Sequence, residues 1–220
     1  MVTKKTKETQ NLVDQLTDDL SEVRVLPSPL KRTVFWGLAS LLMIALAALP
    51  FKALHYEVTL MYQLKFMIEM LVITAIGFFT LYACFRLSIP DIKHSKTAFV
   101  LIGAATVFWA LVSLVLYIKS APLDLHEEVM HLTTHYCVQG LGIITAIPAI
   151  ALYATLRKTA PTLPSWTGYT ALLSVLSFGT IAVRYVCPTE TYAHLLVHHF
   201  GPALFLSFLG LILGKFLLRW

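Results

Sequence analysis

The chain has 220 residues, of which 57% are hydrophobic and only 13% are charged, and its mean hydropathy is +0.74. This composition excludes a soluble globular domain and indicates that lipid is the main solvent of the protein. The formal net charge of +5 requires no nucleic-acid partner, because basic residues that flank membrane spans and contact anionic lipid account for it. We expect no direct nucleic-acid binding.

Residues 1–32 form the first predicted element, a polar segment that contains an acidic amphipathic helix. One stripe of this helix carries Leu12, Val13, Leu16, Leu20 and Val23. The other faces carry Asp14, Asp18, Asp19 and Glu22. Pro27 and Pro29 end the helix and form a stiff tether to the apolar part of the chain. Anionic headgroups repel an acidic helix, so we expect the stripe to bind protein, either the membrane domain of this chain or another protein.

Six apolar runs come next along the chain, each close to the roughly 20 residues that a helix needs to cross a bilayer. They cover residues 33–50, 66–86, 97–118, 136–156, 166–186 and 195–218. Backbone polar groups in hydrocarbon need internal partners, and no run shows the alternation of a barrel strand, so all six are predicted helices. The expected fold is all-α: a six-helix transmembrane bundle over residues 33–220, preceded by a short amphipathic helix.

The distribution of positive charge predicts the orientation of the bundle. An even number of spans leaves both termini on one side, and thirteen of the 17 Lys and Arg residues lie on that side. The positive-inside rule places such a side in the cytoplasm. We therefore expect a multi-pass protein of the bacterial inner membrane whose two termini are cytoplasmic.

Histidines and cysteines gather on the expected outer side. The residues are His55, His126, His131, His135, His194, His198, His199, Cys137 and Cys187. If Leu125–Cys137 is helical, His131 and His135 lie one turn apart, and His194 and His198 form a second such pair. Imidazole and thiolate groups suit zinc, cadmium or copper.

The candidate metal ligands are therefore His131, His135, His194, His198, Cys137 and Cys187. Two other interpretations stay open: single histidines can serve as headgroup-level polar residues, and the two cysteines can form an inert disulfide or a redox-sensitive or metal-sensitive switch. None of these interpretations requires a resident cofactor.

An alternative function is that of a membrane metalloenzyme. The patterns His131-x-x-x-His135 and His194-x-x-x-His198-His199 resemble incomplete histidine boxes of di-iron hydroxylases and desaturases. Those enzymes carry more ligands, on the cytoplasmic side. The chain also lacks a Walker loop, a Rossmann glycine pattern and a nucleophile elbow, so we do not expect an enzyme.

Short motifs at both ends of the chain resemble the NrsF family of multi-spanning bacterial anti-sigma factors, named as negative regulators of sigma F. The N-terminal motifs are Leu16, Asp19-Leu20, Val23-Arg24, Leu26-Pro27 and Pro29. The later ones are Leu156-Arg157, Ala160-Pro161, Pro164, Tyr185, Cys187-Pro188 and Leu218-Arg219-Trp220. One departure is that Val186 precedes Cys187, where the family often has histidine.

The resemblance implies that the N-terminal segment holds an extracytoplasmic-function sigma factor at the membrane. We expect this contact to be made by the apolar stripe and the charges beside it, which are Leu12, Leu16, Asp18, Asp19, Leu20, Val23 and Arg24. It also implies that Cys137 and Cys187 match two periplasmic cysteines that the family ties to a response to heavy metals or oxidants.

Overall fold

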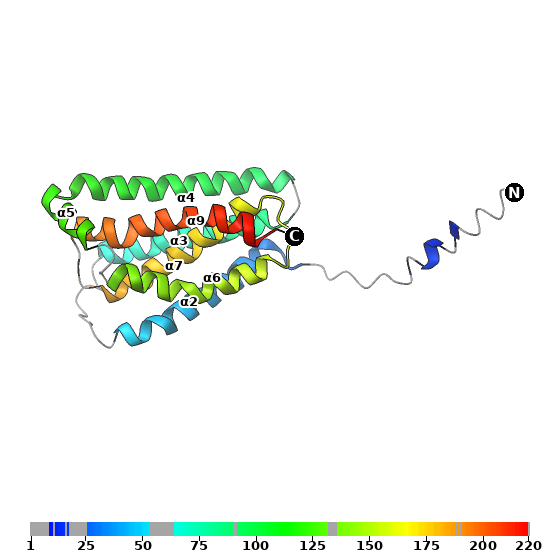
Figure 1. The fold of residues 1–220 in the computed structure, drawn as a ribbon, viewed down its shortest axis with the longest axis horizontal. Helices are drawn as coiled ribbons and strands as arrows, with labels where there is room; N and C mark the ends of the chain where they lie inside the picture. Colours follow the sequence, from blue (N-terminus) through cyan, green and yellow to red (C-terminus); the bar gives the residue numbers. More distant parts are fainter. Residues whose placement is uncertain are drawn as a thin grey trace.

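The computed structural model describes residues 9–10, 12–15, 17, 26–52, 64–89, 92–131, 136–187, 189 and 191–219 of the chain. All regular structure within these ranges is helical (Figure 1). The named elements are α2 (Pro29–Lys52), α3 (Leu64–Leu87), α4 (Ile92–Lys119), α5 (Pro122–Met130), α6 (Tyr136–Leu156), α7 (Pro164–Val186), α8 (Tyr192–His194), the π-helix η2 (Leu195–Phe200) and α9 (Gly201–Leu217).

Six helical segments are long and apolar enough to cross a membrane. They are α2, α3, α4, α6, α7 and the continuous run formed by α8, η2 and α9. The predicted fold class, an all-helical bundle of six spans, is confirmed.

Two helices begin at a proline, a few residues before the start that hydropathy predicts for them. α2 begins at Pro29 rather than at residue 33, and α7 begins at Pro164 rather than at residue 166. A proline fits the first turn of a helix because its missing N–H has no intrahelical partner there. Pro29 therefore belongs to the first span and not to a tether ahead of it.

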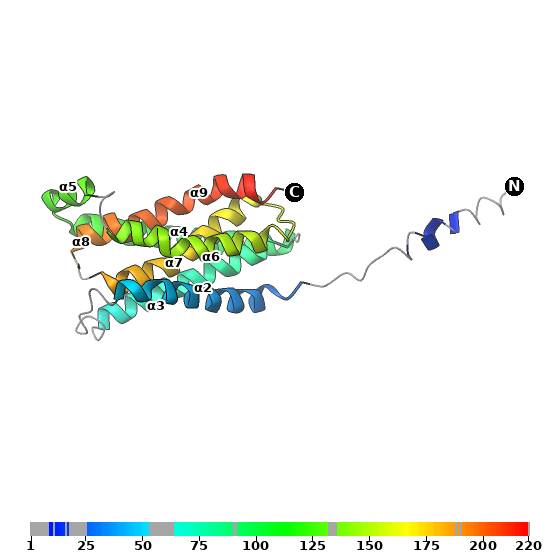
Figure 2. The ribbon, with the colours of Figure 1, turned by 60° about the horizontal axis from the view of Figure 1, so that its bottom comes forward.

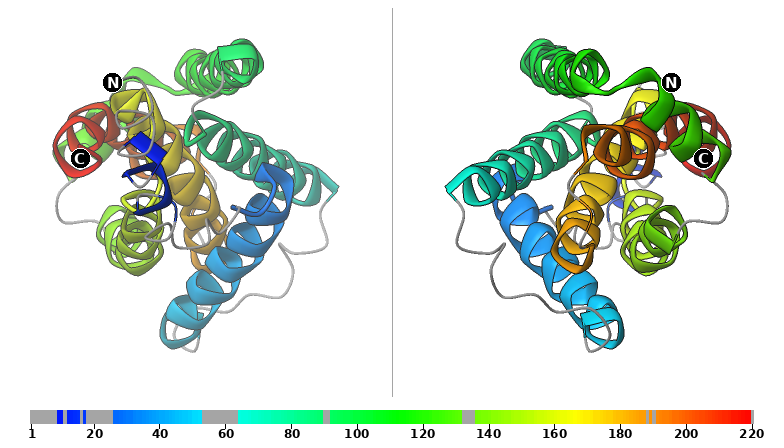
Figure 3. Two further views of the ribbon diagram at one scale, coloured as in Figure 1. Left: turned by 90° about the vertical axis from the view of Figure 1, so that its right-hand side faces the viewer. Right: turned by 90° about the vertical axis from the view of Figure 1, so that its left-hand side faces the viewer.

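α7 is the central helix of the bundle. Of its span, 78% is buried, whereas no other span exceeds 44%. It packs against α9, α3, α6 and α2, while α4 lies at the edge of the bundle (Figure 3). Because α7 contacts four other helices, the residues at its two ends are positioned by several neighbours at once.

Three glycines bring α7 and α9 into backbone contact. A side chain at Gly168 of α7 would collide with the backbone of Gly210 and Gly214 in α9, and the reverse also holds. Small residues at four-residue spacing allow such close approach between membrane helices, where packing replaces hydrophobic burial as the driving force. This contact fixes the distance between the two helices.

The bundle has two distinct ends (Figures 1 and 2). α2 begins and α9 finishes at one end, which we call the entry end. α5, α8 and the last turn of α7 lie at the opposite end, which we call the distal end. The candidate site lies at the distal end.

Candidate functional site

The two outer cysteines lie at helix ends that meet at the distal end. Cys137 is the second residue of α6, and Cys187 directly follows α7 in an extended conformation. Both are buried free thiols, and their sulfur atoms lie within 4.8 Å of each other. Fifty residues of sequence separate them, so only the packing of α6 against α7 brings them together.

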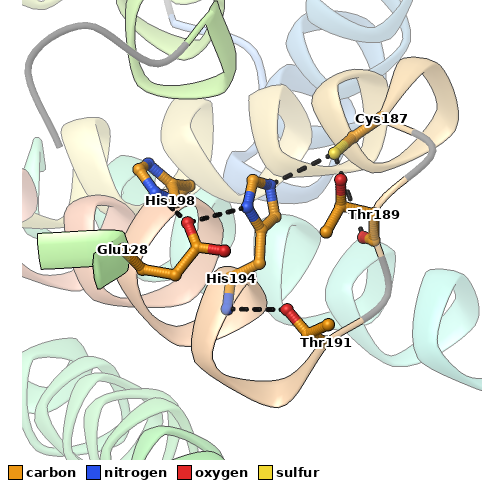
Figure 4. A network of polar contacts seen from close by, with 6 residues as sticks. All are labelled: Glu128, Cys187, Thr189, Thr191, His194 and His198. Carbon is orange, nitrogen blue, oxygen red and sulfur yellow. Dashed lines mark hydrogen bonds and ion pairs between the residues drawn. The ribbon is translucent and has the colours of Figure 1, made fainter. Parts of the chain in front are cut away.

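His194 and Glu128 extend this pair into a chain of polar contacts (Figure 4). The Sγ atom of Cys187 lies 3.3 Å from Nε2 of His194, and the Nδ1 atom of His194 lies 3.2 Å from Oε2 of Glu128. The same carboxylate oxygen lies 2.7 Å from Nε2 of His198. The side chain of Glu128, on α5, thus joins two imidazoles of the last span.

The local sequence positions His194 in this chain of contacts. Thr191 caps α8, and its Oγ1 accepts a hydrogen bond from the backbone N–H of His194 at 3.3 Å. A threonine cap of this kind fixes the first turn of a helix. The cap therefore determines where the imidazole of His194 enters the site.

Hydrogen bonds make Cys187 the more acidic thiol of the pair. The Cys137 thiol donates to the sulfur of Cys187, and this contact lowers the pKa of Cys187 below its ordinary value. Burial opposes the shift, whereas the contact with His194 adds to it. A thiolate is the form of cysteine that binds metals and attacks disulfides, so these contacts favour reaction at Cys187.

The π-helix η2 turns a third histidine toward the same place. A helix closed by i to i+5 hydrogen bonds has more residues per turn than an α-helix, so positions i, i+4 and i+5 share one face. His194, His198 and His199 have this spacing, and the ring of His194 lies 4.6 Å from that of His198 and 5.3 Å from that of His199, between centroids. In a regular α-helix His199 would point away from His194.

An ion pair holds α7 against α3 beside the site. Arg184 donates from Nε and from Nη2 to the two carboxylate oxygens of Glu69, at 2.8 and 3.1 Å. Arg184 lies in the last turn of α7, and its guanidinium also lies 5.4 Å from the ring centre of Phe66. The pair anchors the part of α7 that leads into Cys187.

The structure brings together only part of the predicted ligand set. Cys137, Cys187 and His194 converge with His199, and His194 and His198 converge with Glu128. His131 is exposed and belongs to neither group, and His135 lies outside the described residues.

The continuous helix expected over Leu125–Cys137 is not formed. α5 ends at Met130, His131 is its C-cap, and the next described helix, α6, begins at Tyr136. The predicted one-turn spacing of His131 and His135 stays a prediction, because His135 lies outside the described residues. The predicted ligand set also lacks Glu128, because it contains only histidines and cysteines.

His199 is one of the predicted outer histidines but is not in the predicted ligand set. The signal that would have found it is the i, i+4, i+5 spacing just before Pro202. Proline has no N–H to offer the carbonyl four residues earlier, which favours a wider turn at this point.

Most of the predicted sigma-binding residues lie outside the described part of the chain. They are Leu16, Asp18, Asp19, Leu20, Val23 and Arg24. Leu12 is described; it lies in a helical stretch, and its side chain is 57% exposed. The role of this segment stays a prediction.

The fold and the site together define a six-span helical membrane protein whose thiols and imidazoles gather at one end of the bundle. Within that class the chain belongs to the NrsF family, because the family model described as negative regulator of sigma F matches residues 16–220. Searches of curated proteins and of solved structures find no match. The chain is therefore a negative regulator of a sigma factor, a regulatory role that replaces the metalloenzyme alternative.

Proposed function

We propose that the chain is an anti-sigma factor that holds an extracytoplasmic-function sigma factor at the bacterial inner membrane and releases it when a metal or an oxidant reaches Cys137 and Cys187. The observation that carries this proposal is the buried group of thiols and imidazoles at the distal end, opposite the end at which the first span begins. A protein that senses a signal on one side of a bilayer and binds a sigma factor on the other side needs its two sites at opposite ends of the bundle.

Charge supports the direction of this transfer. The loops and termini at the entry end hold most of the basic residues, so the positive-inside rule assigns that end to the cytoplasm. The distal end then faces the periplasm, where metals and oxidants arrive and where thiol oxidation persists.

The N-terminal segment is the docking element of this proposal. Its stripe of Leu12, Leu16, Leu20 and Val23 packs on the sigma factor, and Asp18, Asp19 and Arg24 supply charge complementarity. The family match begins at residue 16 and so includes most of this stripe, which supports a shared role for it. A docked sigma factor cannot join RNA polymerase.

The signal acts on the ends of α6 and α7. A metal ion binds the two thiolates, or a two-electron oxidant such as a peroxide accepts two electrons while a disulfide forms and both thiol protons leave. Either event changes the packing at the distal end of α7, which also contacts α2, the span attached to the N-terminal segment. To move the docked population from 99% to 1%, the signal must favour the released state by about 5.5 kcal/mol.

Co-purification tests the docking claim. Each extracytoplasmic-function sigma factor of the host is expressed singly with the full-length chain, and the complex is isolated through a tag on the chain. We expect one sigma factor to be retained, and Leu16→Asp or Leu20→Asp to remove it because a carboxylate cannot be buried in an apolar contact.

Gln10→Asp is the matched control, since it adds the same charge outside the stripe and should retain the sigma factor. Retention by both stripe variants would contradict the docking claim.

A further inference from the structure

Four potential ligand atoms gather at the distal end, the number that a tetrahedral metal site requires. The Sγ atoms of Cys137 and Cys187 and one nitrogen each of His194 and His199 all lie within 4.8 Å of one another. Around a zinc-sized ion the same atoms would lie about 3.3–3.8 Å apart, given metal–sulfur and metal–nitrogen bonds of about 2.3 and 2.0–2.1 Å. Small rotations of four side chains bridge this difference.

His199 provides a second and independent reason. Its side chain is 1% exposed, and among the described residues neither ring nitrogen has a hydrogen-bond partner of good geometry, although the ring lies close enough to Cys187 to lower the pKa of that thiol. A buried imidazole without well-formed hydrogen bonds is costly, because its polar atoms have given up water without a full replacement. A metal ion bound to one nitrogen removes that cost.

Glu128 prepares His194 to be a ligand. Its carboxylate lies 3.2 Å from Nδ1 of His194 and accepts a hydrogen bond from that atom when the ring proton is there. In the metal-bound state this tautomer leaves the lone pair of Nε2, which lies 3.3 Å from Sγ of Cys187, free to bind the ion. Carboxylate–histidine–metal arrangements of this kind orient metal-bound imidazoles in many proteins.

His198 holds Glu128 in this position. Its Nε2 atom lies 2.7 Å from the carboxylate oxygen that also contacts His194. Glu128 thus serves two imidazoles at once, and the group of Glu128, His194 and His198 orients a ligand instead of forming a second metal site.

The charge balance selects the kind of ion. As each metal–sulfur bond forms, the thiol proton leaves to solvent, so two thiolates neutralise a divalent cation and the two imidazoles stay neutral. The loaded site has no net charge, which suits a buried position at the end of a membrane bundle. Two thiolates and two imidazoles in a tetrahedron are typical ligands of zinc and of the softer cadmium ion.

We infer that Cys137, Cys187, His194 and His199 form a tetrahedral site for a thiophilic divalent cation of the zinc or cadmium type, with Glu128 as a positioning residue. One ion in this site joins the first turn of α6, the end of α7 and the last span. Only the consequence for sigma release rests on the proposed function; the binding site stands on its ligands.

The experiment uses the full-length chain, purified in detergent with a reductant that contains no thiol. Zn²⁺, Cd²⁺ and Co²⁺ are added singly, and bound metal is counted after removal of excess ion. We expect one ion per chain, and for Co²⁺ the strong visible absorption of tetrahedral coordination together with a thiolate-to-cobalt charge-transfer band.

The variants assign the ligands. Cys137→Ser, Cys187→Ser and His199→Gln should abolish the tetrahedral cobalt spectrum, while His199→Cys should keep one ion per chain with a stronger charge-transfer band. Glu128→Gln should weaken affinity by about 10–100-fold without changing the number of ions bound. The last result identifies a positioning residue, because a lost ligand would change the spectrum.

Two matched controls keep the outcome interpretable. Cys84→Ser removes a buried thiol of α3 that belongs to neither ligand group, and His131→Gln removes an exposed imidazole of the distal end. Both should bind metal as the parent does.

The inference is overturned if the parent binds no ion, if His199→Gln retains the tetrahedral spectrum, or if His198→Gln abolishes binding while His199→Gln does not. The binding assay contains no sigma factor, so a failure of the proposed anti-sigma role would leave its result unchanged. Conversely, if the chain binds no metal but still releases the sigma factor on oxidation, the proposed function is supported and the proposed metal site is refuted.

Discussion

Cys84 and the pair formed by Cys137 and Cys187 show how position decides the role of a cysteine. All three are buried thiols, but Cys84 lies within α3, where its thiol donates to the carbonyl of Thr167 at 3.6 Å. Cys137 and Cys187 lie at helix ends, near each other and near imidazoles. Cys137 and Cys187 therefore have neighbours with which they can bind a metal ion, and each has a second thiol with which it can form a disulfide.

The thiol-sensing proposal predicts the behaviour of cysteine variants in cells. A Cys137→Ser/Cys187→Ser double variant should still repress the sigma-dependent genes but should lose their induction by cadmium or peroxide. A reporter gene under a sigma-dependent promoter measures this. Cys84→Ser is the control and should remain fully inducible; normal induction of the double variant would rule out thiol sensing.

The ion pair between Arg184 and Glu69 makes a second prediction. Glu69→Ala leaves the Arg184 guanidinium buried without its carboxylate, which typically costs about 3–5 kcal/mol; we expect about 3 because the Glu69 side chain is 18% exposed. A Glu69→Leu/Arg184→Met double variant should recover most of this loss, since apolar pairs of similar volume replace buried ion pairs well. Denaturation of the purified protein in detergent micelles measures both, and equal losses in the two variants would contradict this explanation.

At the scale of elements, the glycine contact between α7 and α9 holds together, near the entry end, the same two segments that meet again at the candidate site. Backbone touches backbone at Gly168, Gly210 and Gly214, so the two helices cannot separate there without losing their packing. The last span also carries His194 and His199, which lie beside the cysteine at the end of α7. The two helices therefore share both the glycine contact and the candidate site.

Gly168→Val should therefore be severely destabilising. Its branched side chain would meet the backbone of α9, which cannot move aside as a flexible side chain can. We expect a loss of several kcal/mol, on the order of the larger overpacking effects, seen as a lower midpoint of thermal unfolding in detergent.

The matched control is Gly142→Val, because a side chain there meets nothing within 4 Å. An unchanged midpoint for Gly168→Val would mean that the helices are not in backbone contact.

At the scale of the whole molecule, six spans and a strong charge asymmetry determine the proposed topology. Alkaline phosphatase folds only outside the cytoplasm, so fusions report the side on which a loop lies. A fusion after Ser120, between α4 and α5, should be active, and one after Lys158, between α6 and α7, should be inactive. The opposite pattern would reverse the proposed direction of signalling.

The sequence by itself determined the class of the protein and the number of spans. Hydropathy is a property of each segment taken alone, so apolar runs of sufficient length identify membrane helices without knowledge of their neighbours. The motifs around Leu16 and Cys187 likewise depend only on the order of residues, and the family match over residues 16–220 confirms the resemblance that they indicated.

Only the tertiary structure decided which chemical groups meet. Cys137 and Cys187 lie on different helices, and Glu128 reaches His194 from α5, so their distances depend on packing that no local pattern encodes. The register of η2 decided the role of His199, because a wider turn rotates that residue onto the face of His194. Regular α-helical spacing predicts the opposite, which is why the sequence pointed to Cys137, Cys187 and His194 among the converging groups but not to His199.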